Sequence, residues 1–205
     1  MRDEDVAIAI FTKAPIEGFA KTRLIPRLGA DGAAMLQRRM VERTVQTALA
    51  AGTGPVSLWC MPDCEHEFFR QLAAAQPVTL HEQLGGDLGE RMANAFDIVA
   101  RSRAALLVGT DCVALCPSHL TQCAEFLRGR ADAVFLPAED GGYVLVGLRQ
   151  PAPALFRDIA WTTDRVMFET RARAAHLGLS IVEPATLWDI DRPEDYDRAV
   201  KLGMV

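Results

Sequence analysis

The sequence predicts a single α/β domain over residues 1–205, with a mainly parallel sheet and helices on both of its faces. A chain of 205 residues suits one domain. Short strand-like segments alternate with longer helical segments along the chain, which is the pattern of strand–helix–strand units. No internal repeat, low-complexity tract or linker interrupts this alternation, so we expect no second domain.

Seven apolar segments are predicted as strands. The first, residues 6–11, reads Val-Ala-Ile-Ala-Ile-Phe and is continuously apolar, as a strand buried on both faces should be. The others are predicted at residues 56–60, 78–81, 106–108, 133–136, 143–146 and 180–182.

Helical segments are predicted between these strands. Over residues 31–50 the apolar positions have the period of a helix, and Gly52 follows as a stop signal. Another helix opens at residues 162–164 and stops at Gly178, and we expect Thr162 or Thr163 to cap it. The remaining helices are predicted at 65–75, 89–101 and 117–127, and from Pro193 onward.

Composition excludes several classes of partner. The net charge of −5 and the pI near 5.4 argue against general nucleic-acid binding. No apolar segment approaches the roughly 20 residues of a membrane span, and the first residues do not form a signal peptide. Five cysteines in a chain of this length predict free thiols rather than a disulfide framework. We therefore expect a cytoplasmic protein without a membrane span.

The loop after the first strand is rich in cations and hydroxyls. Lys13, Lys21, Thr22 and Arg23 lie within eleven residues of one another, and Gly18 lies between them. Phosphate groups bind to such loops through lysine charges, bidentate arginine contacts and backbone N–H groups. The spacing of a Walker A loop is absent. The segment predicts phosphate binding, and a solvated charged loop is the alternative.

A glycine-rich segment follows the third predicted strand. Gly85 and Gly86 would let the backbone approach a planar ligand closely. Gln83 offers both a hydrogen-bond donor and an acceptor, as recognition of a nucleobase requires. From the residue types alone, a flexible loop that leads into a helix is the stronger interpretation.

Three further segments carry carboxylates at the ends of predicted strands. Asp111 follows residues 106–108 and so lies at the carboxyl end of a strand, where open α/β sheets bind ligands. A divalent cation such as Mg²⁺ often takes only one or two carboxylates together with substrate phosphates. Asp140 precedes two glycines in a segment that could also be a hairpin turn. Asp189 and Asp191 alternate on an extended segment, and helix capping is the alternative role of Asp191.

Taken together, these segments resemble the nucleotide-diphospho-sugar transferase superfamily, which has the Rossmann-like GT-A fold. The resemblance is closest to the glycosyltransferase-like family related to the 2-phospho-L-lactate guanylyltransferases, known as radical-SAM- or selenodomain-associated transferases. It covers nearly the whole chain in order, through residues 11–15, 20–24, 87–92, 109–112, 139–143, 161–163 and 189–195.

The resemblance implies roles for particular residues. Residues 13–23 correspond to the phosphate-binding loop, and Gln83, Gly85 and Gly86 to a segment that reads a nucleobase. Asp111 corresponds to a metal-binding acid, although Gly109 leaves this chain without the first acid of a full D-x-D motif. Asp191 matches a distal acid that supplies a second metal ligand. We expect Asp111 and Asp191 to share Mg²⁺ or Mn²⁺ with the substrate phosphates.

Three functions remain open. The favoured one is glycosyl transfer from a nucleotide-sugar to a small-molecule acceptor, with Asp140 as the base and Trp161 as a wall of the acceptor pocket. The alternative is nucleotidyl transfer with release of pyrophosphate, in which Lys13, Lys21 and Arg23 neutralise charge. The third is a nucleotide-binding protein without turnover. The catalytic candidates are therefore Asp111, Asp140 and Lys21. A homodimer is left open.

Overall fold

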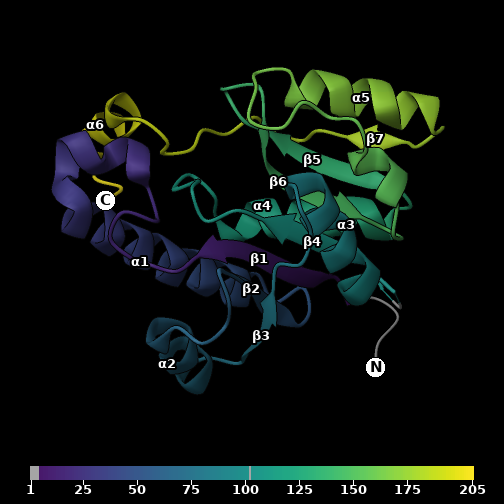
Figure 1. Ribbon diagram of the computed structural model, residues 1–205. Coiled ribbons are helices and arrows are strands. Elements are labelled where there is room, and N and C mark those ends of the chain that lie inside the picture. Colours follow the sequence, from purple (N-terminus) through teal and green to yellow (C-terminus); the bar gives the residue numbers. More distant parts are fainter. Residues whose placement is uncertain (1–4, 102) are drawn as a thin grey trace.

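The computed structural model describes residues 5–101 and 103–205, and it confirms the predicted α/β fold. Within these residues seven strands form one sheet in the order β3-β2-β1-β4-β6-β5-β7 (Figure 1). All the predicted strands are present, with ends within two residues of those expected. They are β1 (Ala7–Lys13), β2 (Val56–Met61), β3 (Val78–Glu82), β4 (Ala105–Val108), β5 (Ala133–Pro137), β6 (Tyr143–Leu148) and β7 (Ile181–Val182).

Only β6 runs against the other strands, which makes the sheet mainly parallel. β5 and β6 form a hairpin through residues 138–142, so the hairpin interpretation of this segment is confirmed. Gly141 allows the turn because its φ is 91°. A Cβ atom there would lie 2.1 Å from the carbonyl oxygen of Asp164, so only glycine fits.

The helices occupy the predicted parts of the chain, but the starts of α1 and α5 differ from those expected. α1 (Ile25–Ala51) starts six residues earlier than expected, because the helix continues across a kink at Gly29. The others are α2 (Glu67–Ala75), α3 (Leu88–Val99), α4 (Pro117–Arg128), α5 (Val166–His176) and α6 (Pro193–Lys201), together with the short 3₁₀ turns η1 (Thr22–Leu24) and η2 (Pro153–Phe156).

The expected threonine cap of α5 is wrong. Arg165 occupies the N-cap position, and Thr162 has a left-handed φ of 72°. The hydroxyl of Thr163 accepts a hydrogen bond from the backbone N–H of Arg165 and donates to the carbonyl of Ala160. Thr163 therefore stabilises a turn before the helix rather than the helix end itself.

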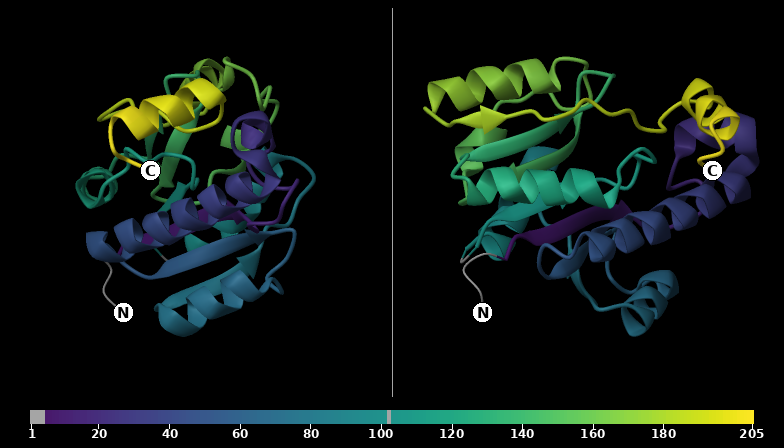
Figure 2. Two further views of the ribbon diagram at one scale, coloured as in Figure 1. Left: turned by 90° about the vertical axis from the view of Figure 1, so that its left-hand side faces the viewer. Right: turned by 180° about the vertical axis from the view of Figure 1, so that it is seen from behind.

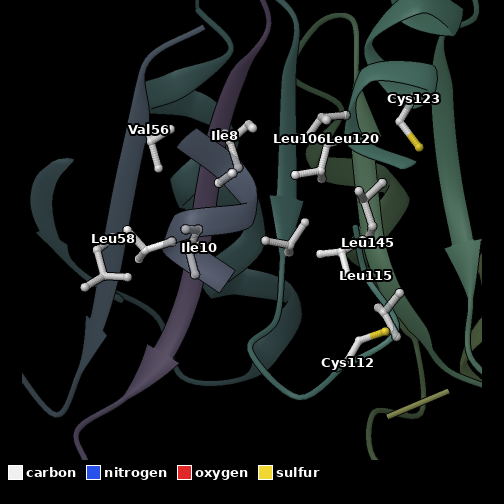
Figure 3. Close-up of a cluster of buried hydrophobic side chains, with 14 of the residues drawn as sticks. Ile8, Ile10, Val56, Leu58, Leu106, Cys112, Leu115, Leu120, Cys123 and Leu145 are labelled. Carbon is white, nitrogen blue, oxygen red and sulfur yellow. The ribbon is translucent and has the colours of Figure 1, made fainter. Parts of the chain in front are cut away.

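Helices cover both faces of the sheet and create two apolar cores (Figure 2). Ile8 and Ile10 of β1 point to the face covered by α1, α2 and α4, which Figure 3 shows in close-up. Ala7, Ala9 and Phe11 point to the face covered by α3 and α5. This alternation explains why the first strand is continuously apolar. All five cysteines are free thiols.

No helix in the part of the chain that the structure describes combines the length and the hydropathy required to cross a bilayer.

Phe135 is the clearest test of the core. Its side chain is 0% exposed on β5 and contacts Tyr143 edge-on, with the ring centroids 5.2 Å apart. We expect Phe135→Ala to lower the free energy of unfolding by about 3–5 kcal/mol, because it removes buried apolar surface and leaves a cavity. Urea denaturation measures this loss. Phe168→Ala on α5, where the side chain is 64% exposed, should change stability by less than about 0.5 kcal/mol. Equal losses in the two variants would contradict the assignment of the core.

Candidate functional site

Four segments that are distant in sequence meet at the carboxyl edge of the parallel strands. They are the β1–η1 loop, the loop after β4, the β5–β6 hairpin and residues 183–192, which run from β7 to α6 (Figure 1). We call the last of these the crossing segment. Its Ile190 N–H donates to the carbonyl of Asp111, and its Leu187 carbonyl accepts from the N–H of Glu139. Residues from all four segments therefore contribute to one site.

Lys21 is the central cation of this site. Its backbone is left-handed, with φ of 51°, and only 5% of its side chain is exposed. The Nζ atom lies 2.9 Å from Oδ1 of Asp111 and also donates to the carbonyl of Ile190. One ammonium group thus joins the loop after β1, the loop after β4 and the crossing segment.

Asp111 pairs with this cation, and Asp189 interacts with the cation and with three other carboxylates. Burial is the main reason that the pKa of Asp189 is raised to about 6, and the charges of Asp140, Asp111 and Asp191 raise it further. The positive charge of Lys21 acts in the opposite direction. These effects place Asp140, Asp111 and Asp191 within electrostatic reach of Asp189. Burial of Asp189 was not foreseen, since its neighbours in sequence gave no sign of it.

The pKa of Asp189 predicts a pH-dependent stability. The folded protein holds the proton of this carboxyl up to about pH 6, whereas the unfolded chain releases it near pH 4. Ionisation of Asp189 therefore destabilises the fold as the pH rises through this window. We expect Asp189→Asn to be more stable than the wild type at about pH 8 and similar to it at about pH 4, as measured by chemical denaturation. Asp158→Asn, at a carboxylate that is 83% exposed, is the control. A constant difference across this range would contradict the prediction.

The other two predicted cations, Arg23 and Lys13, have different partners. Arg23 forms an ion pair with Asp191, and both side chains are partly exposed. Lys13 is exposed at the end of β1, with its Nζ 5.7 Å from the centre of the Phe19 ring. Thr22 is exposed in η1. The structure thus brings Lys21 and Arg23 onto the acids, while Lys13 contacts an aromatic ring.

The glycine-rich segment closes tightly onto the start of α3. Gln83 uses its Nε2 to donate to the carbonyls of Thr12 and Trp59, which fixes its side chain beside the end of β1. Gly85 has φ of 137°, and a Cβ there would lie 2.9 Å from the backbone nitrogen of Arg91. The N–H of Gly86 donates to Glu90. These contacts make the segment an ordered turn into a helix.

Gln37 is a buried polar residue that the sequence analysis missed. It lies on α1, 3% exposed, and donates from Nε2 to the carbonyl of Lys13 at 3.0 Å and to the Thr12 hydroxyl at 3.3 Å. The same nitrogen lies 3.5 Å from the hydroxyl of Thr110, which in turn donates to Asp111. Gln37 therefore ties the end of β1 to the end of β4. A glutamine on the apolar face of a predicted helix was the available signal.

The crossing segment is also fixed at the β5–β6 hairpin. Arg198 of α6 donates two hydrogen bonds to Glu139, which hold the pKa of that carboxyl below its usual value. The guanidinium also stacks 4.2 Å from the ring of Trp188. Asp140, next to Glu139, accepts a hydrogen bond from the Gly142 N–H.

Trp161 lies at the same edge of the sheet. Its indole is half-buried edge-on to Tyr143, the first residue of β6, and fits against Gly89, where a Cβ would approach it to 2.8 Å. Since β6 is antiparallel to β4, its first residue lies beside the end of β4. Formation of an acceptor wall by this indole remains a prediction.

The two predicted metal ligands both lie at this edge, and each pairs with a basic side chain. Asp111 pairs with Lys21 and Asp191 with Arg23. Arg192, not Asp191, occupies the N-cap position of α6, so the capping alternative for Asp191 is wrong. Within residues 5–101 and 103–205, no three His, Cys, Asp or Glu side chains are grouped closely enough to hold a metal ion. These carboxylate oxygens suit a hard cation, but only with further oxygen ligands from a substrate.

Comparison with known proteins gives matches in one family and in several solved structures. The family described as "Uncharacterized protein conserved in bacteria (DUF2064)" matches residues 44–163, which is more than half of the chain. No curated protein sequence matches. A crystal structure from Desulfovibrio desulfuricans G20, provisionally named a nucleotide-diphospho-sugar transferase, is 29% identical, with a TM-score of 0.84 over 93% of this chain and 84% of that one.

Two more distant structures share the fold. The 4-diphosphocytidyl-2C-methyl-D-erythritol synthase of Anaerococcus prevotii is 13% identical, with a TM-score of 0.66 over 99% of this chain and 98% of that one. The inositol-1-phosphate CTP transferase of T. maritima is 14% identical, with a TM-score of 0.63 over 100% and 96%. These likenesses confirm the predicted fold class and extend to the fold alone.

Proposed function

The chain belongs to the DUF2064 family, and on this premise we propose that it is a transferase that binds a nucleotide at the carboxyl edge of its sheet. The reaction that the geometry supports best is nucleotidyl transfer to a phosphorylated small molecule. The observation that carries this proposal is the buried ammonium of Lys21, which is directed at Asp111 beside the other acids. The likeness to the D. desulfuricans protein supports the general class of transferase.

In this reaction an oxygen of the acceptor phosphate attacks the α-phosphorus of a nucleoside triphosphate. The bond to the bridging oxygen breaks, and pyrophosphate leaves with the electron pair. The protein contributes mainly by positioning the two phosphates and by neutralising their charge. Lys21 and Arg23 are the cations placed to do this, since both lie on the loop after β1 at the acids.

A divalent cation is part of the proposal. Asp111 and Asp191 would hold Mg²⁺ or Mn²⁺ together with oxygens of the substrate, because two protein carboxylates are enough for such an ion when phosphates complete its ligands. When bound, the ion neutralises charge on the triphosphate. Lys21 and Arg23, which pair with these acids in the structure, would then be available to the phosphates.

Glycosyl transfer from a nucleotide-sugar is the second candidate, favoured by one observation. The charge of Asp140 acts on Asp189, so the hairpin tip brings a further carboxylate to the site. Asp140 would deprotonate an acceptor hydroxyl, and a nucleoside diphosphate would leave. The relation to the 2-phospho-L-lactate guanylyltransferases, the reading of a base by Gln83, Gly85 and Gly86, a cytoplasmic location and a homodimer also remain proposals.

The products separate these candidates. The purified protein is incubated with each nucleoside triphosphate and phosphorylated acceptors, or with nucleotide-sugars and hydroxyl acceptors, with and without Mn²⁺. Release of pyrophosphate supports nucleotidyl transfer, and release of a nucleoside diphosphate supports glycosyl transfer. A thermal-shift screen of the same nucleotides identifies the ligand, since binding to the native state raises the melting temperature. A protein that binds nucleotides but releases neither product would contradict both reactions.

Arg23 gives a separate test of the phosphate site. We expect Arg23→Ala to weaken nucleotide binding by roughly 1.5–3 kcal/mol, because a charge-assisted hydrogen bond to phosphate is lost. Isothermal titration calorimetry measures the change. Arg70→Ala, where the exposed side chain lies on α2 and pairs with Glu65, is the control and should bind as the wild type does. Unchanged affinity in Arg23→Ala would count against its role.

A further inference from the structure

A pocket lies at the edge of the sheet opposite the candidate site, where β1 and β4 begin and β6 ends. Its volume is about 410 Å³. Its lining brings together residues before β1, between α3 and β4, at the end of α4 and after β6. The charged residues that line it in the described part of the chain are four arginines and one carboxylate: Arg101, Arg103, Arg128, Arg149 and Asp5. We call it the amino-edge pocket.

Two of these arginines have donors that no acceptor uses. Arg103 is half-buried and makes no hydrogen bond or ion pair with any residue that the structure describes. Arg149 pairs with Asp132 through Nη2, but its Nε is buried and has no hydrogen-bond partner within residues 5–101 and 103–205. An unused buried donor costs free energy, and so does the crowding of positive charges. An anion in the pocket would accept hydrogen bonds from Arg103 and offset the positive charges.

Arg101 can serve the same ligand. Arg101 pairs with Asp97, but both side chains are more than 60% exposed, and an exposed ion pair contributes little stability. Its guanidinium can therefore turn toward the pocket at low cost. The chain as a whole carries a net charge of −5, whereas the charged residues of this pocket are mainly positive. Guanidinium groups bind phosphate oxygens in pairs, which a point charge cannot do.

We propose that the amino-edge pocket binds a small anion that carries a diphosphate group. The excess of arginines over carboxylates suits several negative charges, and the volume suits a small molecule. The same chemistry is present in free pyrophosphate and in a nucleoside diphosphate. None of the lining residues belongs to the candidate site at the other edge, so this proposal does not depend on the proposed function.

Titration calorimetry with pyrophosphate, in a metal chelator and at low salt, tests the proposal. Arg103→Gln should weaken binding by about tenfold, because a charge-assisted contact is lost. Arg70→Gln, which changes an exposed arginine on α2, is the matched control and should bind as the wild type does. Lys21→Met removes the central cation of the other site and should leave this binding in place. Melting temperatures of the variants confirm that each is folded.

Two results would overturn the proposal. One is equal binding of pyrophosphate by Arg103→Gln and the wild type. The other is complete loss of binding in Lys21→Met, which would assign all the binding to the carboxyl edge. Parallel titrations with inorganic phosphate and cytidine diphosphate identify the source of the anion. Tighter, Arg103-dependent binding of the nucleotide supports a nucleoside diphosphate, and preference for pyrophosphate supports the free anion.

Discussion

Lys21→Met is expected to lower turnover by about 10²–10³-fold, because the substitution removes a preorganised cation from a largely buried position. Methionine is similar in length to the lysine stem, so the apolar part of the side chain keeps its packing. Without the ammonium, Asp189 loses the positive charge that opposes its raised pKa, and nucleotide phosphates lose their central partner. Pyrophosphate release at saturating nucleotide measures the loss of turnover, and calorimetry measures the loss of binding.

Lys201→Met is the matched control, since Lys201 is exposed at the end of α6. It removes the same charge from the chain and should keep wild-type turnover. Thermal melting of Lys21→Met separates loss of chemistry from loss of folding, because Asp111 is 45% exposed and water can solvate it after the ion pair is gone. A folded Lys21→Met protein with wild-type turnover would remove the observation on which the proposed function stands.

Asp111→Asn is expected to abolish the metal-dependent part of nucleotide binding and to reduce turnover by about 10²-fold or more. The amide has almost the same shape as the carboxylate but lacks the charge that a hard cation requires. Nucleotide binding in a chelator should persist, because Lys21 is then released from its ion pair and stays available to phosphate. Titrations with and without Mn²⁺ measure the two components.

Asp158→Asn provides the control for charge, because this carboxylate is 83% exposed and pairs with Arg173, away from both sites. It should bind and turn over as the wild type does. Survival of metal-dependent binding and turnover in Asp111→Asn would show that the metal assignment is wrong. Loss of binding both with and without Mn²⁺ would instead assign to Asp111 a structural role in holding Lys21.

Most of the strands were predictable because they are mainly apolar, as burial on both faces of a sheet requires. The edge strand β3 differs, since it contains threonine, histidine and glutamate and is only partly buried. The start of α1 was not, since Gly29 obscures the helical pattern yet only kinks the helix. The predicted threonine cap of α5 was wrong because Thr162 and Thr163 belong to the turn that precedes the helix. Local sequence signals cannot distinguish between these uses of the same residue types.

In the candidate site, too, some residues were predictable from local patterns, whereas others depend on contacts between distant segments. Strand ends and residue chemistry selected Lys21, Arg23 and Asp111, and the family resemblance added Asp191. The structure brings all four to one edge. The pairing of Lys21 with the carbonyl of Ile190, 169 residues away, has no local signal. Burial of Asp189 and the bridging role of Gln37 depend in the same way on contacts between distant segments.

The crossing segment affects the stage of folding at which the candidate site becomes complete. Lys21 and Arg23 belong to the first loop after β1, whereas Ile190 and Asp191 are among the last residues to reach the sheet in chain order. Contacts of such long range form only after the entropy of closing the intervening chain has been overcome. A partly folded protein with an intact sheet would therefore still lack Asp189 and Asp191, two of the four acids of the site. Binding of a nucleotide at this edge, as proposed, would therefore report that the domain has completed its folding.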